Sequence, residues 1–179
     1  TGEYAGLVVP PKIKKMGYKG VESTELVYDG YKCPAENILG GEEAGLNKGF
    51  GQMMDALEVG RVNVAARGVG IAQRALELAL RYSQERKTFG KPIAQHQAIQ
   101  FKLADMATKL EAARLVTRKA ARMKDAGIRS DLEAGMAKLI ASETGKEVVE
   151  DCFRIHGGYG YSKEYEIERL YRDAPLLLI

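Results

Sequence analysis

The side chains best suited to chemistry in this sequence lie in and just after a short loop at residues 86–92. The planar guanidinium of Arg86 can donate paired hydrogen bonds to phosphate oxygens, and Thr88 adds a hydroxyl donor. His96 and Gln97 follow where a helix is expected to start, and free backbone amides at a helix start also favour anions. The loop is therefore a candidate anion site. Taken by itself, such a loop is more often a solvated surface, and that alternative stays open.

A glycine-rich string, Gly157-Gly158-Tyr159-Gly160, is a second candidate. Glycine is required where a Cβ would clash with a close ligand or where φ must be positive. The same glycines also suit a helix end, and the two roles are compatible. Arg154, just before them, adds a cation. Elsewhere, Glu58 and Arg61 lie three residues apart on an expected helix, where a surface ion pair is the simplest interpretation.

Other kinds of chemistry are not indicated by residue types or spacing. The two histidines and two cysteines are isolated, so neither a metal site nor a disulfide framework is expected, and free thiols suit a reducing compartment. The net charge of +3 comes from interleaved acids and bases, which favours a solvated surface over a nucleic-acid footprint. No apolar run approaches the roughly 20 residues that span a bilayer, so no membrane partner is expected.

The first 40 residues have a strand-like sequence pattern, unlike the rest of the chain. Residues 6–10 and 25–33 are rich in Val, Leu and Tyr and are predicted as strands, with a turn at residues 16–20. Two strands form no stable sheet alone. We therefore expect residues 1–40 to be the C-terminal remnant of a larger β domain.

From about Asn47, apolar residues recur every three or four positions, which predicts helices at about 47–85, 94–126 and 130–156. A short helix is expected at 163–171. The first helix contains Gly60, Gly68 and Gly70, each of which costs about 1 kcal/mol relative to alanine. Glycines retained at such a cost suggest that another helix or a ligand approaches closely.

Two signals mark the helix ends. Gly127 suits the end of the second helix, and Ser130 with Glu133 is predicted to form a capping box that opens the third. Long helices joined by short loops form antiparallel bundles. The expected fold is mainly α: residues 41–179 form an incomplete antiparallel four-helix bundle, truncated before its last helix and preceded by the β-domain remnant.

Several strings resemble motifs of the acyl-CoA dehydrogenase family and follow one another along the chain in the family's order. They are residues 82–93 (YSQERKTFGKPI), 96–106 (HQAIQFKLADM), 155–161 (IHGGYGY), 171–174 (YRDA), and 26–28 (LVY) with 33–40 (CPAENILG). The resemblance implies a C-terminal bundle domain, FAD as cofactor and a homo-oligomer, either dimer or tetramer, with FAD held across a subunit interface. It assigns contact with FAD to Arg86, Thr88, Phe89, His96, Gln97, Arg154, Gly157 and Gly158.

Within that set, Arg86 would reach the diphosphate of the neighbouring subunit's FAD, and Phe89 would place a flat apolar face beside the nucleotide. Gly157 and Gly158 would let the backbone approach the adenosine end. Arg154 stands where many relatives carry glutamine, so a cation replaces an amide there.

The resemblance also places Glu58 and Arg61 beside the acyl-CoA substrate, and it implies that a glutamate removes the α-proton. One family position for this base is occupied here by Gly60, which has no side chain. The other is expected just after Ile179. No catalytic residue is therefore expected within the chain.

The function implied by the resemblance is oxidation of an acyl-CoA to a trans-2-enoyl-CoA, with electrons passed to an electron-transfer flavoprotein. The isolated chain is expected to be inactive. Two alternatives stay open: a non-catalytic scaffold or CoA-binding paralogue of the same fold, and an acyl-CoA oxidase. The expected location is the cytoplasm for a bacterial protein and the mitochondrial matrix for a eukaryotic one.

Overall fold

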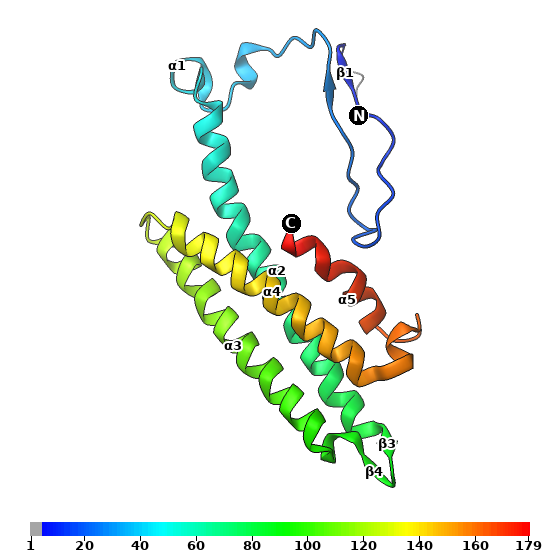
Figure 1. Cartoon of the computed structure of the whole chain (residues 1–179). Coiled ribbons are helices and arrows are strands. Elements are labelled where there is room, and N and C mark those ends of the chain that lie inside the picture. Colours follow the sequence, from blue (N-terminus) through cyan, green and yellow to red (C-terminus); the bar gives the residue numbers. More distant parts are fainter. Residues whose placement is uncertain (1–4) are drawn as a thin grey trace. The chain divides into compact units, whose positions relative to one another are not determined.

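The computed structural model describes residues 5–179, which belong to two compact units (Figure 1). The first unit ends at Ala56 and the second comprises Leu57–Ile179, so the boundary falls inside the first long helix. The division expected from the sequence, at residues 40/41, follows instead the change from strand to helix. The mainly α fold is confirmed, because long helices make up most of the second unit.

The first unit contains a small antiparallel pair of strands, β1 (Leu7–Val8) and β2 (Val27–Tyr28), coloured blue in Figure 1. Both are shorter than predicted. Pro10 and Pro11 follow β1 and have no amide hydrogen to continue the ladder. Beyond them the two arms still pair through the Ile13 amide, which donates to Ser23 O at 2.8 Å. A 3-10 turn (Ala35–Asn37), a short helix α1 (Gly41–Gly45) and the start of α2 complete this unit.

The second unit is built on three long helices: α2 (Gly49–Glu85), α3 (Gln97–Asp125) and α4 (Asp131–His156). A two-stranded hairpin, β3 (Lys87–Thr88) with β4 (Lys91–Pro92), and a 3-10 turn at Ile93–Gln95 join α2 to α3. After α4 come a 3-10 turn (Gly157–Tyr161), α5 (Ile167–Asp173) and a last 3-10 turn (Ala174–Leu178). The predicted helix bounds are confirmed to within a few residues, except that the short helix begins four residues later.

The helices pack through two kinds of core. The larger is filled by long apolar side chains of all three long helices and α5, including Leu76, Leu110, Val149 and Leu170. The smaller consists of alanines, among them Ala65, Ala113 and Ala141. Small residues let helix backbones approach closely.

Gly68 marks that close approach. A Cβ built on it would lie 2.5 Å from the carbonyl oxygen of Ala141 on α4. A Cβ on Gly60 or Gly70 would meet nothing within 4 Å. The expectation of a close neighbour is thus confirmed for Gly68, whereas no described residue approaches the other two.

Ion pairs cross between the antiparallel helices α3 and α4 with one consistent polarity. Lys109 Nζ lies 2.7 Å from Glu147, and Lys119 Nζ lies 3.7 Å from Glu133. Lys102 pairs in the same way with Asp151. In each of the three pairs the lysine belongs to α3 and the carboxylate to α4.

The start of α4 corrects the predicted capping box. Ser130 does occupy the residue before the helix, but its side chain makes no capping hydrogen bond. Its hydroxyl instead donates to Glu58 Oε1 on α2, and Glu133 pairs with Lys119. The prediction was wrong because a carboxylate distant in sequence competes with the local amides for the serine. Gly127, with φ 68°, follows α3 as predicted.

Candidate functional site

The ends of α2 and α4 meet around an open pocket of about 480 Å³, here called the hairpin pocket. It brings together residues from the β3–β4 loop and from the glycine string, which are far apart in the sequence. Its walls are Tyr82, Arg86, Thr88, Ile93, Ile155, His156, Gly157, Gly158 and Tyr159. Four of the residues predicted to contact a cofactor therefore lie together: Arg86, Thr88, Gly157 and Gly158.

Arg86 is fixed by its backbone while its guanidinium remains available. Its amide donates to Tyr82 O at 2.9 Å and its carbonyl accepts from Ile93 N at 2.9 Å. The guanidinium carbon lies 5.7 Å from the centre of the Tyr159 ring. Among the described residues, no carboxylate pairs with it, so its charge faces the pocket uncompensated.

The hairpin holds Thr88 and His96 against each other. Thr88 Oγ1 and His96 Nε2 are 3.0 Å apart, and they share one hydrogen bond. Phe89 and Gly90 form the turn between β3 and β4 with φ values of 50° and 79°, as in tight hairpin turns with two positive φ angles. Phe89 is 97% exposed at this tip, and its ring edge meets His96 at 6.3 Å between centroids.

The floor of the pocket is aromatic. The buried ring of His156 stacks on Tyr82 with centroids 4.1 Å apart, and its Nδ1 donates to the Cys152 carbonyl at 2.8 Å. Burial lowers the pKa of His156 and raises that of Tyr82, so both are uncharged near neutral pH. Burial also raises the pKa of the Cys152 thiol to about 12, which leaves it unreactive.

The glycine string contributes bare backbone to the lining of the pocket. Gly157 has φ 57° and ψ −137°, a conformation that side chains rarely adopt. A Cβ on Gly157 or Gly158 would meet nothing within 4 Å, so both positions border open space that a side chain would fill. An arginine, a hydroxyl and glycine backbone around open space fit the diphosphate part of a dinucleotide.

Four predicted cofactor residues do not line the hairpin pocket: Phe89, His96, Gln97 and Arg154. Arg154 is exposed on α4, and its Nε pairs with Glu150 Oε1 at 2.9 Å. Gln97 is the first residue of α3 and is exposed.

The two predicted substrate residues, Glu58 and Arg61, lie nearer the N-terminal end of α2. The ion pair between Glu58 and Arg61 that the sequence left open is not formed. Glu58 accepts from Ser130 Oγ at 2.8 Å and pairs with Lys124 Nζ at 3.3 Å, and its side chain is 16% exposed. These partners, Ser130 first, hold the pKa of the Glu58 carboxyl below its usual value. Arg61 is exposed and has no ion pair among the described residues.

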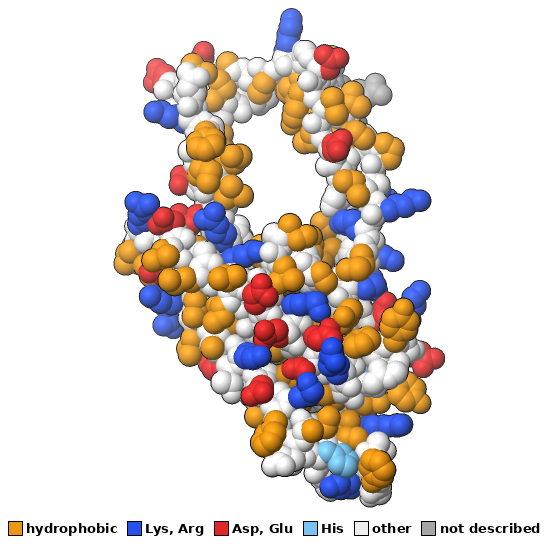
Figure 2. Space-filling model, viewed as in Figure 1, with side chains coloured by type: hydrophobic (Ala, Val, Ile, Leu, Met, Phe, Trp, Pro, Cys, Tyr) orange, Lys and Arg blue, Asp and Glu red, His pale blue; other side chains and the backbone are white. Residues whose placement is uncertain are grey.

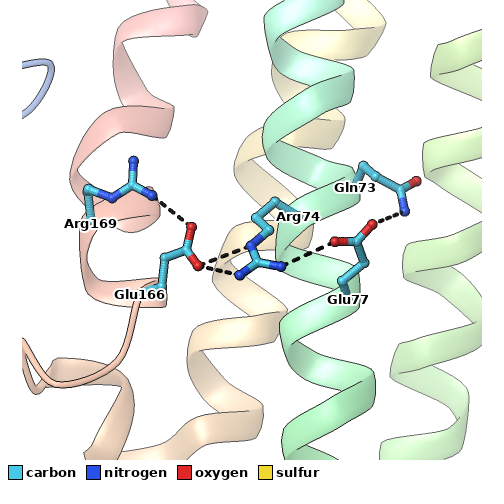
Figure 3. A network of polar contacts seen from close by, with 5 residues as sticks. All are labelled: Gln73, Arg74, Glu77, Glu166 and Arg169. Atoms are coloured by element: carbon cyan, nitrogen blue, oxygen red, sulfur yellow. Dashed lines mark hydrogen bonds and ion pairs between the residues drawn. The ribbon is translucent and has the colours of Figure 1, made fainter.

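A polar network fixes α5 beside the pocket (Figure 3). Arg74 on α2 donates to Glu166 Oε2 from Nε at 3.0 Å and from Nη2 at 2.6 Å, and Arg169 binds the other oxygen of Glu166 at 2.7 Å. Tyr165, the residue before Glu166, packs against the rings of Tyr82 and Tyr159. The network therefore supports the aromatic side of the pocket.

Residues 5–179 contain no cluster of three or more His, Cys, Asp or Glu side chains that could hold a metal ion. None of the helices in that range is long and apolar enough to cross a membrane. On the face drawn in Figure 2, Lys and Arg side chains alternate with Asp and Glu over the helices.

Sequence reasoning did not single out Tyr82, His156 or Tyr159 as site residues. Each lies within a string that resembles the family, but only their packing shows that they share one pocket.

Comparisons with known proteins identify the family of this chain. A family model described as "Acyl-CoA dehydrogenase, C-terminal domain" matches residues 47–179. The caffeyl-CoA reductase–Etf complex subunit CarC of Acetobacterium woodii is 48% identical over 165 residues, which cover 92% of this chain and 42% of that relative. The chain thus spans about two fifths of the length of the curated relatives that it matches.

Two solved structures have the same fold. Butyryl-CoA dehydrogenase from Megasphaera elsdenii superposes with a TM-score of 0.91 at 43% identity, over 97% of this chain and 44% of that one. An acyl-CoA dehydrogenase from Bacillus anthracis, solved in complex with FAD, gives a TM-score of 0.86 at 35% identity, over 98% of this chain and 32% of that one.

Proposed function

Because this chain belongs to the acyl-CoA dehydrogenase family, we propose that the full-length protein oxidises an acyl-CoA to a trans-2-enoyl-CoA. In this proposal FAD is the cofactor and an electron-transfer flavoprotein is the electron acceptor. The similarity to a subunit of a reductase–Etf complex and to a structure solved with FAD supports both assignments.

The observation that carries the proposal is the hairpin pocket. Arg86 supplies an unpaired cation, Thr88 a hydroxyl, and Gly157 and Gly158 backbone that a ligand can approach closely. These groups would bind the diphosphate and the adjoining sugar. The flavin ring would supply the hydride acceptor for the β-hydrogen of the substrate.

The described residues bind and orient but do not remove the α-proton. Gly60 offers no side chain at one of the two expected positions. Glu58 is held by Ser130 and Lys124 in its charged form, and its lowered pKa makes it a poor base. We therefore assign proton removal to a carboxylate outside residues 5–179.

On the substrate side, Arg61 is the residue proposed to contact the CoA moiety. It is exposed, cationic and one residue beyond Gly60, where the Cβ position is open. Glu58 is proposed to act only through the structure of α2.

Anaerobic titration of the full-length protein with acyl-CoAs of different chain lengths tests the proposal. At least one should bleach the bound flavin, and the reduced enzyme should then reduce an electron-transfer flavoprotein faster than it forms hydrogen peroxide. A flavin that no acyl-CoA reduces would refute the dehydrogenase assignment. Rapid peroxide formation would favour an oxidase instead.

A second candidate is the same chemistry in the opposite direction, the reduction of a 2-enoyl-CoA. The Acetobacterium relative favours it, because that protein is named a reductase. Supplying the enzyme with a reduced electron-transfer flavoprotein and a 2-enoyl-CoA, and comparing the forward and reverse rates, distinguishes the two.

A further inference from the structure

Arg86 has no acidic partner among the described residues, unlike two arginines on the preceding helix α2. Arg81, five residues earlier, pairs with Glu85 at 3.0 Å, and Arg74 pairs with Glu166 at 2.6 Å. Arg86 makes neither a hydrogen bond nor an ion pair through its side chain within the described part of the chain. Its guanidinium carbon lies 5.7 Å from the centroid of the Tyr159 ring.

A ring face restrains an arginine in a way that a carboxylate does not. A cation within about 6 Å of a ring centroid is attracted by the electron-rich face. A carboxylate would neutralise the charge and occupy the N–H donors, which lie in the plane of the guanidinium. An aromatic partner leaves both the charge and those donors available for an incoming anion.

Tyr159 is itself held in place. Its ring packs on Tyr165 at 5.4 Å between centroids, and Tyr165 also meets the ring of His156 at 5.8 Å. The residue after Tyr165 is Glu166, which Arg74 and Arg169 bind (Figure 3). Tyr159 remains 48% exposed, so one part of its ring packs on Tyr165 while another borders the open pocket.

We propose that Tyr159 is a positioning residue for anion binding, whose ring holds the Arg86 guanidinium over the hairpin pocket and leaves its donors free for a diphosphate. The inference rests on the proposed function insofar as that diphosphate belongs to FAD. In this arrangement the ring of Tyr159 takes the place that a carboxylate has beside Arg74 and Arg81.

A double-mutant cycle tests the proposal. Dissociation constants for FAD, and for ADP as a diphosphate without a flavin ring, are measured by calorimetry on the flavin-depleted full-length protein. Tyr159→Leu should weaken both ligands about 2- to 5-fold, the range typical of exposed cation–π contacts. Tyr159→Phe, the matched control, keeps the ring face and should bind as the wild type does. In an Arg86→Gln background, Tyr159→Leu should have no further effect.

The outcomes separate this inference from the proposed function. If Tyr159→Leu weakens binding equally with and without Arg86, the ring acts by packing alone and the inference is overturned. The same holds if Tyr159→Leu binds as the wild type does, or if Tyr159→Phe is as weak as Tyr159→Leu. ADP binding with the expected coupling but no FAD binding would sustain the inference and refute the function. Failure to bind either ligand would refute both.

Discussion

The hydroxyl of Ser130 donates a hydrogen bond to Glu58 Oε1 at 2.8 Å, although the two residues lie 72 positions apart. Ser130 is fully buried, and Lys124 Nζ lies 3.3 Å from the same carboxylate oxygen. The contact ties the first third of α2 to the turn between α3 and α4. In the proposed function, this carboxylate acts through the fold rather than through the chemistry.

Removing that hydroxyl should destabilise the protein. Ser130→Ala is expected to lower the free energy of unfolding by about 1–2 kcal/mol, because a partly buried hydrogen bond from the Ser130 hydroxyl is lost. Urea unfolding measures the change. Ser142→Ala is the matched control, since Ser142 is also buried but its hydroxyl bonds only to Leu139 O in its own helix. Equal losses in the two variants would contradict a special role for the contact with Glu58.

The glycines of α2 should respond oppositely to alanine. Gly68→Ala places a Cβ 2.5 Å from the Ala141 carbonyl oxygen, so α2 and α4 must separate, at a cost of about 1–3 kcal/mol. Gly70→Ala meets nothing within 4 Å and should stabilise the helix by up to about 1 kcal/mol. Thermal unfolding of the two variants gives the comparison. A stable Gly68→Ala protein would show that the helices do not touch there.

His156 should make stability depend on pH. Burial lowers the pKa of His156 below the ordinary value of 6.5, so the unfolded chain binds a proton more readily than the folded one. Stability is therefore fully present above pH 6.5 and decreases as the pH falls from 6.5 through the lower pKa of the folded state. His156→Gln should flatten this part of the curve, measured by urea unfolding at several pH values. An unchanged curve for His156→Gln would remove His156 as its cause.

Arg86 should be needed for cofactor binding, because its guanidinium supplies both a positive charge and paired hydrogen-bond donors. Arg86→Gln is expected to raise the dissociation constant for FAD about 10- to 100-fold, the loss typical of hydrogen bonds to a charged group. Arg81→Gln is the matched control, because Arg81 pairs with Glu85 and lies outside the pocket. Fluorescence titration reports both constants. Similar values for the two variants would remove Arg86 from the site.

Much of this fold was predictable from sequence because it depends on local pattern. The spacing of apolar residues predicted a helix at 47–85, and α2 runs from Gly49 to Glu85. Gly127 and Gly157 end helices with positive φ, as their lack of a side chain suggests. The capping box predicted at Ser130 was wrong, because the Ser130 hydroxyl donates to Glu58, which only the packing of α2 brings near.

The candidate site, too, was predictable from the sequence only where residue type alone was informative. Arg86 and the glycine string stood out by residue type, and the structure brings them into one pocket. Tyr159 did not stand out, because its contact with Arg86 joins two segments that meet only when α2 and α4 end side by side. Arg154 carries the charge expected of a phosphate contact, yet Glu150 on its own helix already pairs with it.

The ion pairs between α3 and α4 also discriminate between partners. Since all three lysines, Lys102, Lys109 and Lys119, belong to α3, a second α3 packed in place of α4 would oppose lysine to lysine. Like charges at that distance repel, whereas the native pairing joins opposite charges. The charges therefore favour packing of α3 against α4 and oppose packing of α3 against another α3. The pattern disfavours the pairing of two α3 helices, whether these belong to one chain or to two.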